Sequence, residues 1–195
     1  LCQYDKEFNH TIISLSDSPD PDLEASLIKL NIPLFSLNFR DGKIKFSGLL
    51  KLYRLIKKIN PDIVQTWMIH ADLIGGLTAR FIGIKNIFWG VHHTELIHGK
   101  VKWSTILILK INVFLSYFIP KKIIYCAEKS RSVQESIGFK KSKGAVIQNG
   151  YDIKRFYKNT NLGNNFRNEL KISDDTFVIG HVGSYDPLKD QTTLI

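Results

Sequence analysis

The chain has 195 residues, of which 44% are hydrophobic, enough for a packed core and too many for an intrinsically disordered protein. The formal net charge is +9, and residues 25–171 concentrate it, with 25 Lys and Arg against eight Asp and Glu. Such a positive field attracts anionic lipid or phosphorylated substrates, unless the lysines only solvate helix faces. We expect no nucleic-acid partner, because the sequence has neither zinc-finger spacing nor an aromatic RNA-binding strand motif.

Strand and helix patterns alternate along the first 150 residues. The predicted strands are residues 11–16, 33–39, 62–66, 86–91, 122–127 and 145–148. The predicted helices are residues 22–30, 48–59, 71–82, 103–119 and 129–137. Strands that alternate with helices predict an α/β fold with a Rossmann-like, doubly wound parallel sheet.

The apolar segment 103–119 needs a test as a membrane span. It is seventeen residues long and has Lys110 and Asn112 at its centre, whereas a spanning helix needs ~20 predominantly apolar residues. We therefore predict a buried or interfacial helix that ends before Pro120. Cys126 lies in another apolar run, which favours a free thiol over a disulfide or a metal ligand.

Ligands of parallel α/β sheets sit beyond the carboxyl ends of the strands. The residues that follow the predicted strands are therefore candidates for a site. They are Trp67, His70, His92, His93, Glu95, Glu128, Asn149 and Gly150. For His70 we leave two roles open, lining a ligand pocket or capping the following helix. For His92 and His93 the alternative to a site is one side chain packed on the sheet and one on the surface.

The composition of the sequence changes after Gly150. Residues 151–168 are polar and contain five Asn, which predicts a crossing between two domains, 1–150 and 151–195. Residues 177–182 then predict a strand, followed by a turn and a helix for which Asp190 is a plausible N-cap. A strand, a glycine turn and a helix in this order can present backbone N–H groups to an anion.

Four segments in this order resemble glycosyltransferase family 4. They are "NPDIVQTWMIHADLIGGLTARFIGIKNIFWGVHHTEL", "IIYCAEKSRSVQESIGF", "VIQNGYDIKRF" and "IGHVGSYDPLKDQTTLI". The resemblance implies the GT-B architecture, in which an N-terminal acceptor domain and a nucleotide-sugar-binding domain face each other across a cleft. It also implies a chain truncated at both ends, since the family's first strand with its glycine-rich loop and its later pair of glutamates have no counterpart here.

The resemblance assigns roles to the candidate residues. His92 would be catalytic, orienting the transferred sugar and donating hydrogen bonds to an oxocarbenium-like state rather than acting as the nucleophile. The expected acceptor-binding residues are His93, Glu95, Trp67, His70 and Asn149. The expected donor-binding residues are Gly183, Ser184 and Lys189. Family members usually have Arg where Ser184 stands, so this donor turn has one positive charge fewer.

The implied activity is transfer of a sugar from a nucleotide-diphosphate sugar to a glycan or lipid-linked acceptor, with retention of configuration. We expect no metal and no further cofactor, and we expect this polypeptide alone to transfer no sugar. The expected location is the cytoplasm, including the inner face of the membrane. Two alternatives stay open: a non-catalytic Rossmann-like module that docks on an anionic membrane or a partner through the basic helix 48–59, and a GT-B epimerase of nucleotide-sugars.

Overall fold

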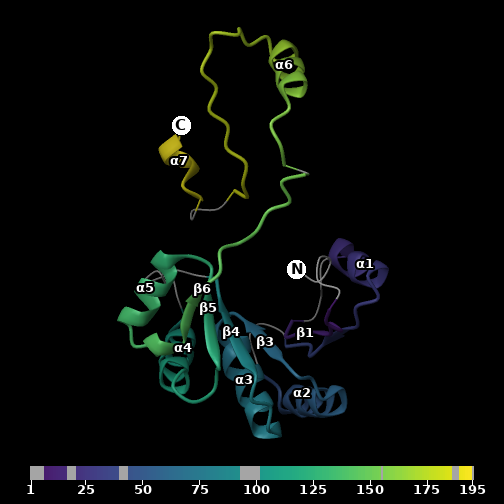
Figure 1. The fold of residues 1–195 in the computed structure, drawn as a ribbon, viewed down its shortest axis with the longest axis vertical. Helices are drawn as coiled ribbons and strands as arrows, with labels where there is room; N and C mark the ends of the chain where they lie inside the picture. Colours follow the sequence, from purple (N-terminus) through teal and green to yellow (C-terminus); the bar gives the residue numbers. More distant parts are fainter. Residues whose placement is uncertain are drawn as a thin grey trace. The chain divides into compact units, whose positions relative to one another are not determined.

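The computed structural model describes residues 7–16, 21–39, 44–92, 102–154, 156–185 and 189–194. The chain divides into two compact units, Leu1–Asn149 and Gly150–Ile195. Figure 1 traces both, and each is described by itself.

The described residues of the first unit form six strands, and every strand pair is parallel. A four-stranded sheet has the order β3-β4-β5-β6, and β1 and β2 pair in a separate sheet (Figure 1). The strands are β1 (Ile12–Ser14), β2 (Leu34–Ser36), β3 (Val64–Trp67), β4 (Ile87–Val91), β5 (Lys122–Tyr125) and β6 (Gly144–Val146). Each overlaps a predicted strand, which confirms the predicted parallel α/β fold.

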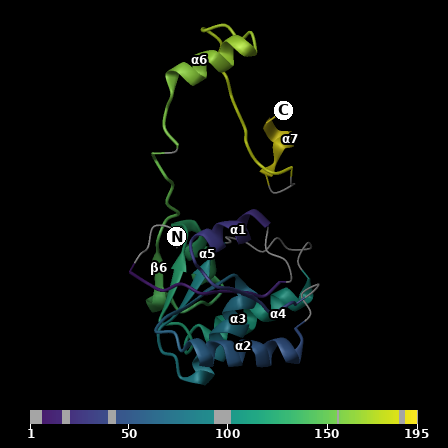
Figure 2. The ribbon, with the colours of Figure 1, turned by 90° about the vertical axis from the view of Figure 1, so that its right-hand side faces the viewer.

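Helices connect these strands, as parallel pairing requires. They are α1 (Pro21–Lys29), α2 (Phe46–Ile59), α3 (Ile69–Ile82), α4 (Trp103–Leu115) and α5 (Glu128–Ser136), with a short 3₁₀ helix η1 (Lys141–Lys143) before β6. α3 packs on β3 and β4 and also contacts α2 and α4. Figures 1 and 2 show these three helices side by side.

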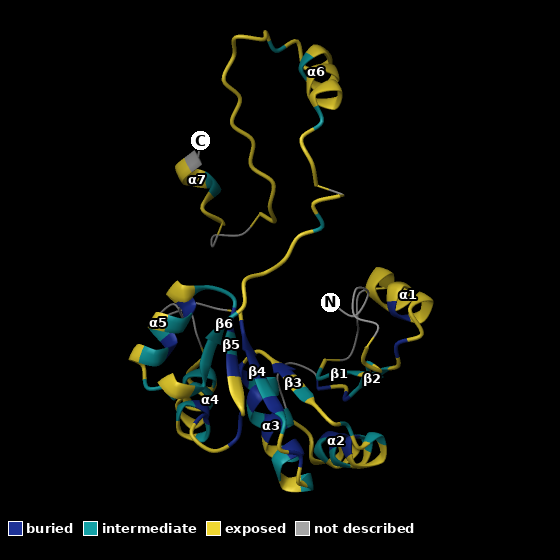
Figure 3. Cartoon of the chain, viewed as in Figure 1, coloured by how far each residue is buried: buried dark blue, intermediate teal, exposed yellow. Residues whose placement is uncertain are grey.

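The core of the first unit is centred on β4 and β5. Trp89 and Ile87 are fully buried in β4, as is Tyr125 in β5. Figure 3 colours buried residues dark blue. A Cβ added to Gly76 of α3 would lie 2.8 Å from Trp89 Nε1, so only glycine lets the helix pack this closely on the strand. This close packing fixes the position of α3 against β4. Because α3 begins and β4 ends at the same edge of the sheet, the packing also fixes that edge.

The apolar helix α4 is partly buried, as predicted, although it ends at Leu115 and not at residue 119. Asn112 is fully buried, and its Nδ2 donates a hydrogen bond to the Ile69 carbonyl at 2.7 Å, which ties α4 to the start of α3. Lys110 stays exposed. Among the residues described, no helix is both long and apolar enough to cross a membrane.

The described part of the second unit contains α6 (Thr160–Glu169) and α7 (Gln191–Leu194) but no strand. The strand predicted at residues 177–182 is therefore wrong, and Phe177 and Val182 are 87% and 102% exposed. A β-rich sequence becomes a strand only where a neighbour satisfies its N–H and C=O groups, and no neighbour is present in the described residues.

The polar crossing predicted at residues 151–168 contains a helix that the prediction missed. The side chain of Asn159 accepts a hydrogen bond from Leu162 N at 3.0 Å and so caps α6. Asparagine is among the best N-cap residues as well as a loop residue, and here it begins a helix.

Candidate functional site

The carboxyl ends of β3 and β4 bring two of the expected site residues together. Trp67, the last residue of β3, pairs with Gly90 of β4. A Cβ on Gly90 would lie 3.3 Å from Trp67 Cε3, so glycine leaves room for the indole to lie over the strand. The indole there stacks on the imidazole of His92, with ring centroids 4.7 Å apart and planes 30° apart.

The Trp67–His92 stack offers two kinds of contact to a ligand. Trp67 is 41% exposed and His92 is also exposed, so both rings are accessible. An indole face packs against apolar C–H groups, and a ring N–H of imidazole can donate to a hydroxyl or to developing negative charge. This pairing of an aromatic face with a hydrogen-bond donor suits a sugar ring.

Met68, directly after Trp67, has an unusual backbone conformation. Its φ of 74° and ψ of 152° lie in a region that only glycine adopts readily, at a cost of about 1–3 kcal/mol for other residues. Its N–H donates to the Gly90 carbonyl at 3.3 Å, and its carbonyl accepts from Asp72 N at 2.9 Å. Such strain is concentrated at functional sites, and here it sets the direction in which the chain leaves Trp67.

A buried acid, Asp72, stabilises the turn at Met68. Asp72 is 2% exposed, and Thr66 Oγ1 donates a hydrogen bond to its Oδ1 at 2.5 Å. Burial raises the pKa of Asp72 to about 7, and the hydrogen bond from Thr66 partly opposes that rise. The pair ties the first turn of α3 to the end of β3, on either side of Met68.

The remaining candidates of the first unit lie elsewhere on the edge or outside the described residues. His70 is half-buried in the first turn of α3, and Met68 occupies the N-cap position, so His70 does not cap the helix. Asn149 is exposed in the coil beyond β6, and Glu128 begins α5. His93 and Glu95 lie outside the described residues.

The expected donor turn lies in the second unit. Gly183, Ser184 and Lys189 are all exposed. A Cβ on Gly183 would lie 3.9 Å from Lys189 Cγ, so the lysine stem runs close to the glycine. Gln191 Nε2 donates to the Ser184 carbonyl at 2.7 Å. Asp190, the expected N-cap, has a φ of 49°, and its carboxylate accepts hydrogen bonds from the hydroxyls of the two threonines that follow Gln191.

A model of Glycosyltransferase Family 4 matches residues 2–155, which include both strands of the stacked pair. The chain belongs to glycosyltransferase family 4. It is 25% identical over 186 residues to the UDP-Gal:alpha-D-GlcNAc-diphosphoundecaprenol alpha-1,3-galactosyltransferase of Escherichia coli, covering 95% of this chain and 48% of that relative.

Solved structures agree with the family on the fold. HepE (Alr3699) of Anabaena in complex with UDP and glucose superposes with a TM-score of 0.72 at 17% identity, over 95% of this chain and 56% of HepE. Its complex with UDP-glucose gives a TM-score of 0.69 at 18% identity, over 94% and 55% of the two chains. The family 4 chain thus has the parallel α/β fold predicted for a GT-B glycosyltransferase and spans about half the length of these relatives.

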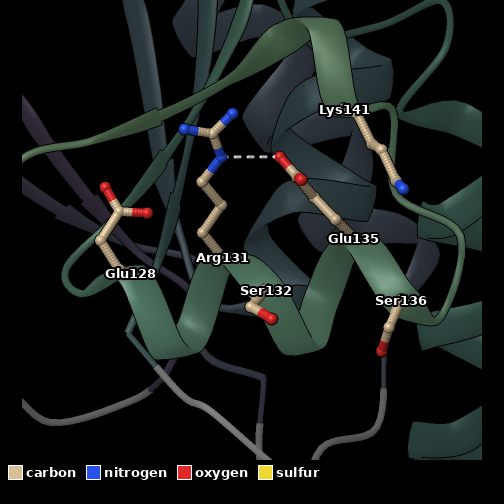
Figure 4. Close-up of a pocket in the computed structure, with 6 residues that line it drawn as sticks. All are labelled: Glu128, Arg131, Ser132, Glu135, Ser136 and Lys141. Atoms are coloured by element: carbon tan, nitrogen blue, oxygen red, sulfur yellow. Dashed lines mark hydrogen bonds and ion pairs between the residues drawn. The ribbon is translucent and has the colours of Figure 1, made fainter.

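A hollow of about 450 Å³ lies beside α5 of the family 4 domain, and Figure 4 shows the residues that line it. It is lined by Glu128, Arg131, Ser132, Glu135, Ser136 and Lys141. Arg131 Nε donates to Glu135 Oε1 at 2.8 Å, so part of the charge in the hollow is already paired. Ligand pockets are mostly apolar with a few polar groups, and this hollow has no aromatic ring for a sugar to pack on. We therefore place the candidate site at the Trp67–His92 stack.

Within the described ranges, no three His, Cys, Asp or Glu side chains are grouped so that they could hold a metal ion. Asp72, in the first turn after Trp67, is buried and accepts its hydrogen bond from Thr66.

Sequence reasoning missed the residues that shape the stack. An isolated glycine inside a strand signals a close approach of another group, so Gly90 within "IFWGV" carried a usable signal. The Thr66–Asp72 pair carried a weaker signal: a Thr at the end of a predicted strand, and an acid in the first turn of the helix that follows. Nothing in the sequence marks Met68 for a positive φ, because methionine rarely adopts one.

Proposed function

We propose that the protein containing this chain is a glycosyltransferase that transfers a hexose from a UDP-sugar to a lipid-linked, diphosphate-containing acceptor, with retention of configuration. Membership of family 4 supports the reaction class. The E. coli relative, whose name gives UDP-Gal and a diphosphoundecaprenol acceptor, and HepE with UDP-glucose support the substrate classes. The excess of Lys and Arg in residues 25–171 favours anionic substrates of this kind.

The observation that carries the proposal is the Trp67–His92 stack at the carboxyl edge of the sheet. In transfer through an oxocarbenium-like state, positive charge develops on the sugar while the diphosphate leaves. His92 would orient the sugar by donating hydrogen bonds to its hydroxyls, and Trp67 would hold both the imidazole and the apolar face of a bound sugar. Gly90 and the strained Met68 keep the indole in place.

The other candidates have separate proposed roles in the two units. His70, Asn149, His93 and Glu95 would contact the acceptor. Gly183 and Ser184 would offer backbone N–H groups to the donor diphosphate, with Lys189 as a charged partner for its oxygens. The diphosphate sugar is the co-substrate, and no metal is required by this scheme. A lipid-linked acceptor would favour a location at the inner face of the membrane, in contact with an anionic lipid surface.

The test uses the complete protein with labelled UDP-galactose and UDP-glucose and an undecaprenyl-diphosphate-linked N-acetylglucosamine acceptor. We expect transfer of one labelled hexose, with the anomeric configuration of the donor retained in the product by NMR. The 195-residue chain alone should give no transfer above buffer. Hydrolysis or epimerisation of the donor without transfer, or inversion in the product, would contradict the proposal.

A non-catalytic docking module is the second candidate, favoured by the basic helix α2, which has four Lys and Arg and no acid. The two candidates differ in their response to His92→Ala. Loss of turnover without loss of folding supports the transferase, whereas a complete protein that lacks turnover in both forms supports the docking module.

A further inference from the structure

The outer faces of α2, α3 and α4 form one broad surface, with α3 in the middle (Figures 1 and 2). The three helices carry six basic residues: Lys51, Arg54, Lys57, Lys58, Arg80 and Lys110. Lys51 and Arg80 donate hydrogen bonds to backbone carbonyls of the protein, so the exposed cations of the surface are Arg54, Lys57, Lys58 and Lys110. Their single acid is Asp72, which is 2% exposed and faces Thr66. The surface, called here the α2–α4 face, is therefore positive without any exposed acid of its own.

Large apolar side chains stand among these cations. Phe81 is 83% exposed, Phe46 is 81% exposed, Trp103 is 75% exposed and Phe114 is 65% exposed. Smaller exposed fractions belong to Leu50, Leu77, Leu107, Ile111 and, just after α4, Phe118. Exposed aromatic and aliphatic side chains at this density on adjacent helices mark an interaction surface.

Cations and rings are interleaved on the α2–α4 face. Lys57 Nζ lies 5.8 Å from the ring centroid of Tyr53, which itself lies 6.2 Å from that of Phe81. Tyr117 lies two residues after the end of α4, and Lys140 Nζ lies 4.9 Å from its ring centroid. In both pairs the lysine ammonium lies over an aromatic ring, a cation–π contact. Lysines and aromatic rings are also the side chains that are favoured together at a lipid interface.

We propose that the α2–α4 face docks on an anionic lipid bilayer. Charge complementarity selects this occupant, since exposed cations without acids gain about 1 kcal/mol each near an anionic leaflet, and aromatic side chains prefer the headgroup level. A protein partner fits less well, because Lys is depleted from protein interfaces. Nucleic acid fits less well because its interfaces are polar, whereas Phe81 and Trp103 present apolar area.

This docking has a consequence for the site, which rests on the proposed function. α3 follows β3, so its first turn lies at the carboxyl edge of the sheet, and Asn112 of α4 is hydrogen-bonded to that turn. Docking through the α2–α4 face would bring that edge, and the Trp67–His92 stack, close to the headgroups where a lipid diphosphate lies.

The experiment measures flotation of the 195-residue chain with vesicles of phosphatidylethanolamine containing 30% phosphatidylglycerol, and with neutral phosphatidylcholine vesicles. We expect binding to the anionic vesicles only, with a blue shift in tryptophan emission. Trp103→Phe should remove the shift and keep the binding. Lys57→Gln with Lys110→Gln should weaken binding about fivefold for each lysine, and Phe81→Ser with Phe114→Ser about tenfold.

Matched controls lie in the second unit. Phe166→Ser with Phe177→Ser removes two exposed phenylalanines, and Lys154→Gln with Lys158→Gln removes two exposed lysines. Neither control should change binding. Equal binding to neutral vesicles, or equal losses in the controls, would overturn the proposal. The proposal would also be overturned if the chain does not bind vesicles but forms a dimer in sedimentation velocity, and Phe81→Ser with Phe114→Ser dissociates that dimer.

The vesicles contain no acceptor, so a protein that is not a transferase would still bind them. Conversely, if the complete protein transfers sugar to a detergent-dissolved acceptor and does not bind vesicles, the docking is wrong and the proposed function stands.

Discussion

Two segments of this chain have similar sequences and opposite structures. β4, "IFWGV", lies between β3 and β5, and its Ile87, Trp89 and Val91 are 1% exposed or less. Residues 177–182, "FVIGHV", are also β-branched and aromatic around a glycine, yet all of them are exposed (Figure 3). The composition of a segment sets its preference for a strand, but strands on both sides decide whether it becomes one and is buried.

Each of the two segments also precedes residues that have a proposed role. His92 follows β4, while Gly183 and Lys189 follow residues 177–182. A residue after a buried strand is held by the sheet, and a residue after an exposed segment is held only by local contacts. The following substitutions test that difference.

The largest difference should come from Trp89→Ala against Phe177→Ala. Trp89 is fully buried, so its truncation leaves a cavity and should cost about 3–5 kcal/mol of unfolding free energy. Phe177→Ala should change it by no more than about 0.5 kcal/mol. Urea unfolding of both variants measures this. Trp89→Phe is the control for volume, since Trp89 Nε1 has no hydrogen-bond partner in the described structure. Equal effects of the two alanines would contradict the comparison.

The pH dependence of stability should differ in sign between the two units. The folded state raises the pKa of Asp72 to about 7 by burial, so the native state holds a proton that the unfolded state releases near pH 4. Unfolding free energy should therefore fall by about 1.4 kcal/mol for each pH unit between about pH 4 and 7, and level off above. In Asp72→Asn, which keeps an oxygen acceptor for Thr66, this fall should vanish, and the variant should exceed the wild type at pH 8.

Asp175 in the second unit is the matched acid. A hydrogen bond from Ser173 lowers its pKa, so its contribution is present at neutral pH and is lost as the pH falls through the acid range. Urea unfolding of the wild type, Asp72→Asn and Asp175→Asn at several pH values separates the two. A fall between pH 4 and 7 that persists in Asp72→Asn would contradict the assignment.

His92→Ala should damage turnover far more than folding. The residue lies beyond the end of β4, so the cost in stability should stay within about 1 kcal/mol. Loss of the hydrogen bonds by which His92 orients the sugar should slow transfer ~10²–10³-fold. The measurements are kcat and Tm of the complete protein. His93→Ala should be milder, and a His92→Ala enzyme with near wild-type kcat would remove His92 from the site.

Lys189→Gln should have the smallest effect, on donor affinity. A charge-assisted hydrogen bond contributes roughly 1.5–3 kcal/mol, so the KM for the UDP-sugar should rise about 10–100-fold with kcat less affected. Ser184→Arg should act in the opposite direction by adding a cation beside Gly183. If neither variant changes the donor KM, this turn does not hold the diphosphate.

The sequence predicted the strands of the first unit well because each strand has a neighbouring strand that pairs with its backbone. The same propensity failed at residues 177–182, where no described strand is adjacent. For the site, the rule that ligands lie beyond strand ends selected Trp67 and His92 separately. Their stacking depends on Gly90 and on the φ of Met68, which are products of pairing between strands and of a turn, and local sequence does not encode them.

The order of the strands bears on how the domain forms during translation. β3, β4, β5 and β6 are adjacent in the sheet in the same order as in the chain. Ribosomes add about 5–20 residues per second, so each new strand emerges when its partner has already been made. Every addition closes a connection with a single α-helix in the described residues, and the entropy cost of closure rises only slowly with the length of a connection. The sheet can therefore grow by one edge at a time, with β6 as the last edge of the four strands to be synthesised.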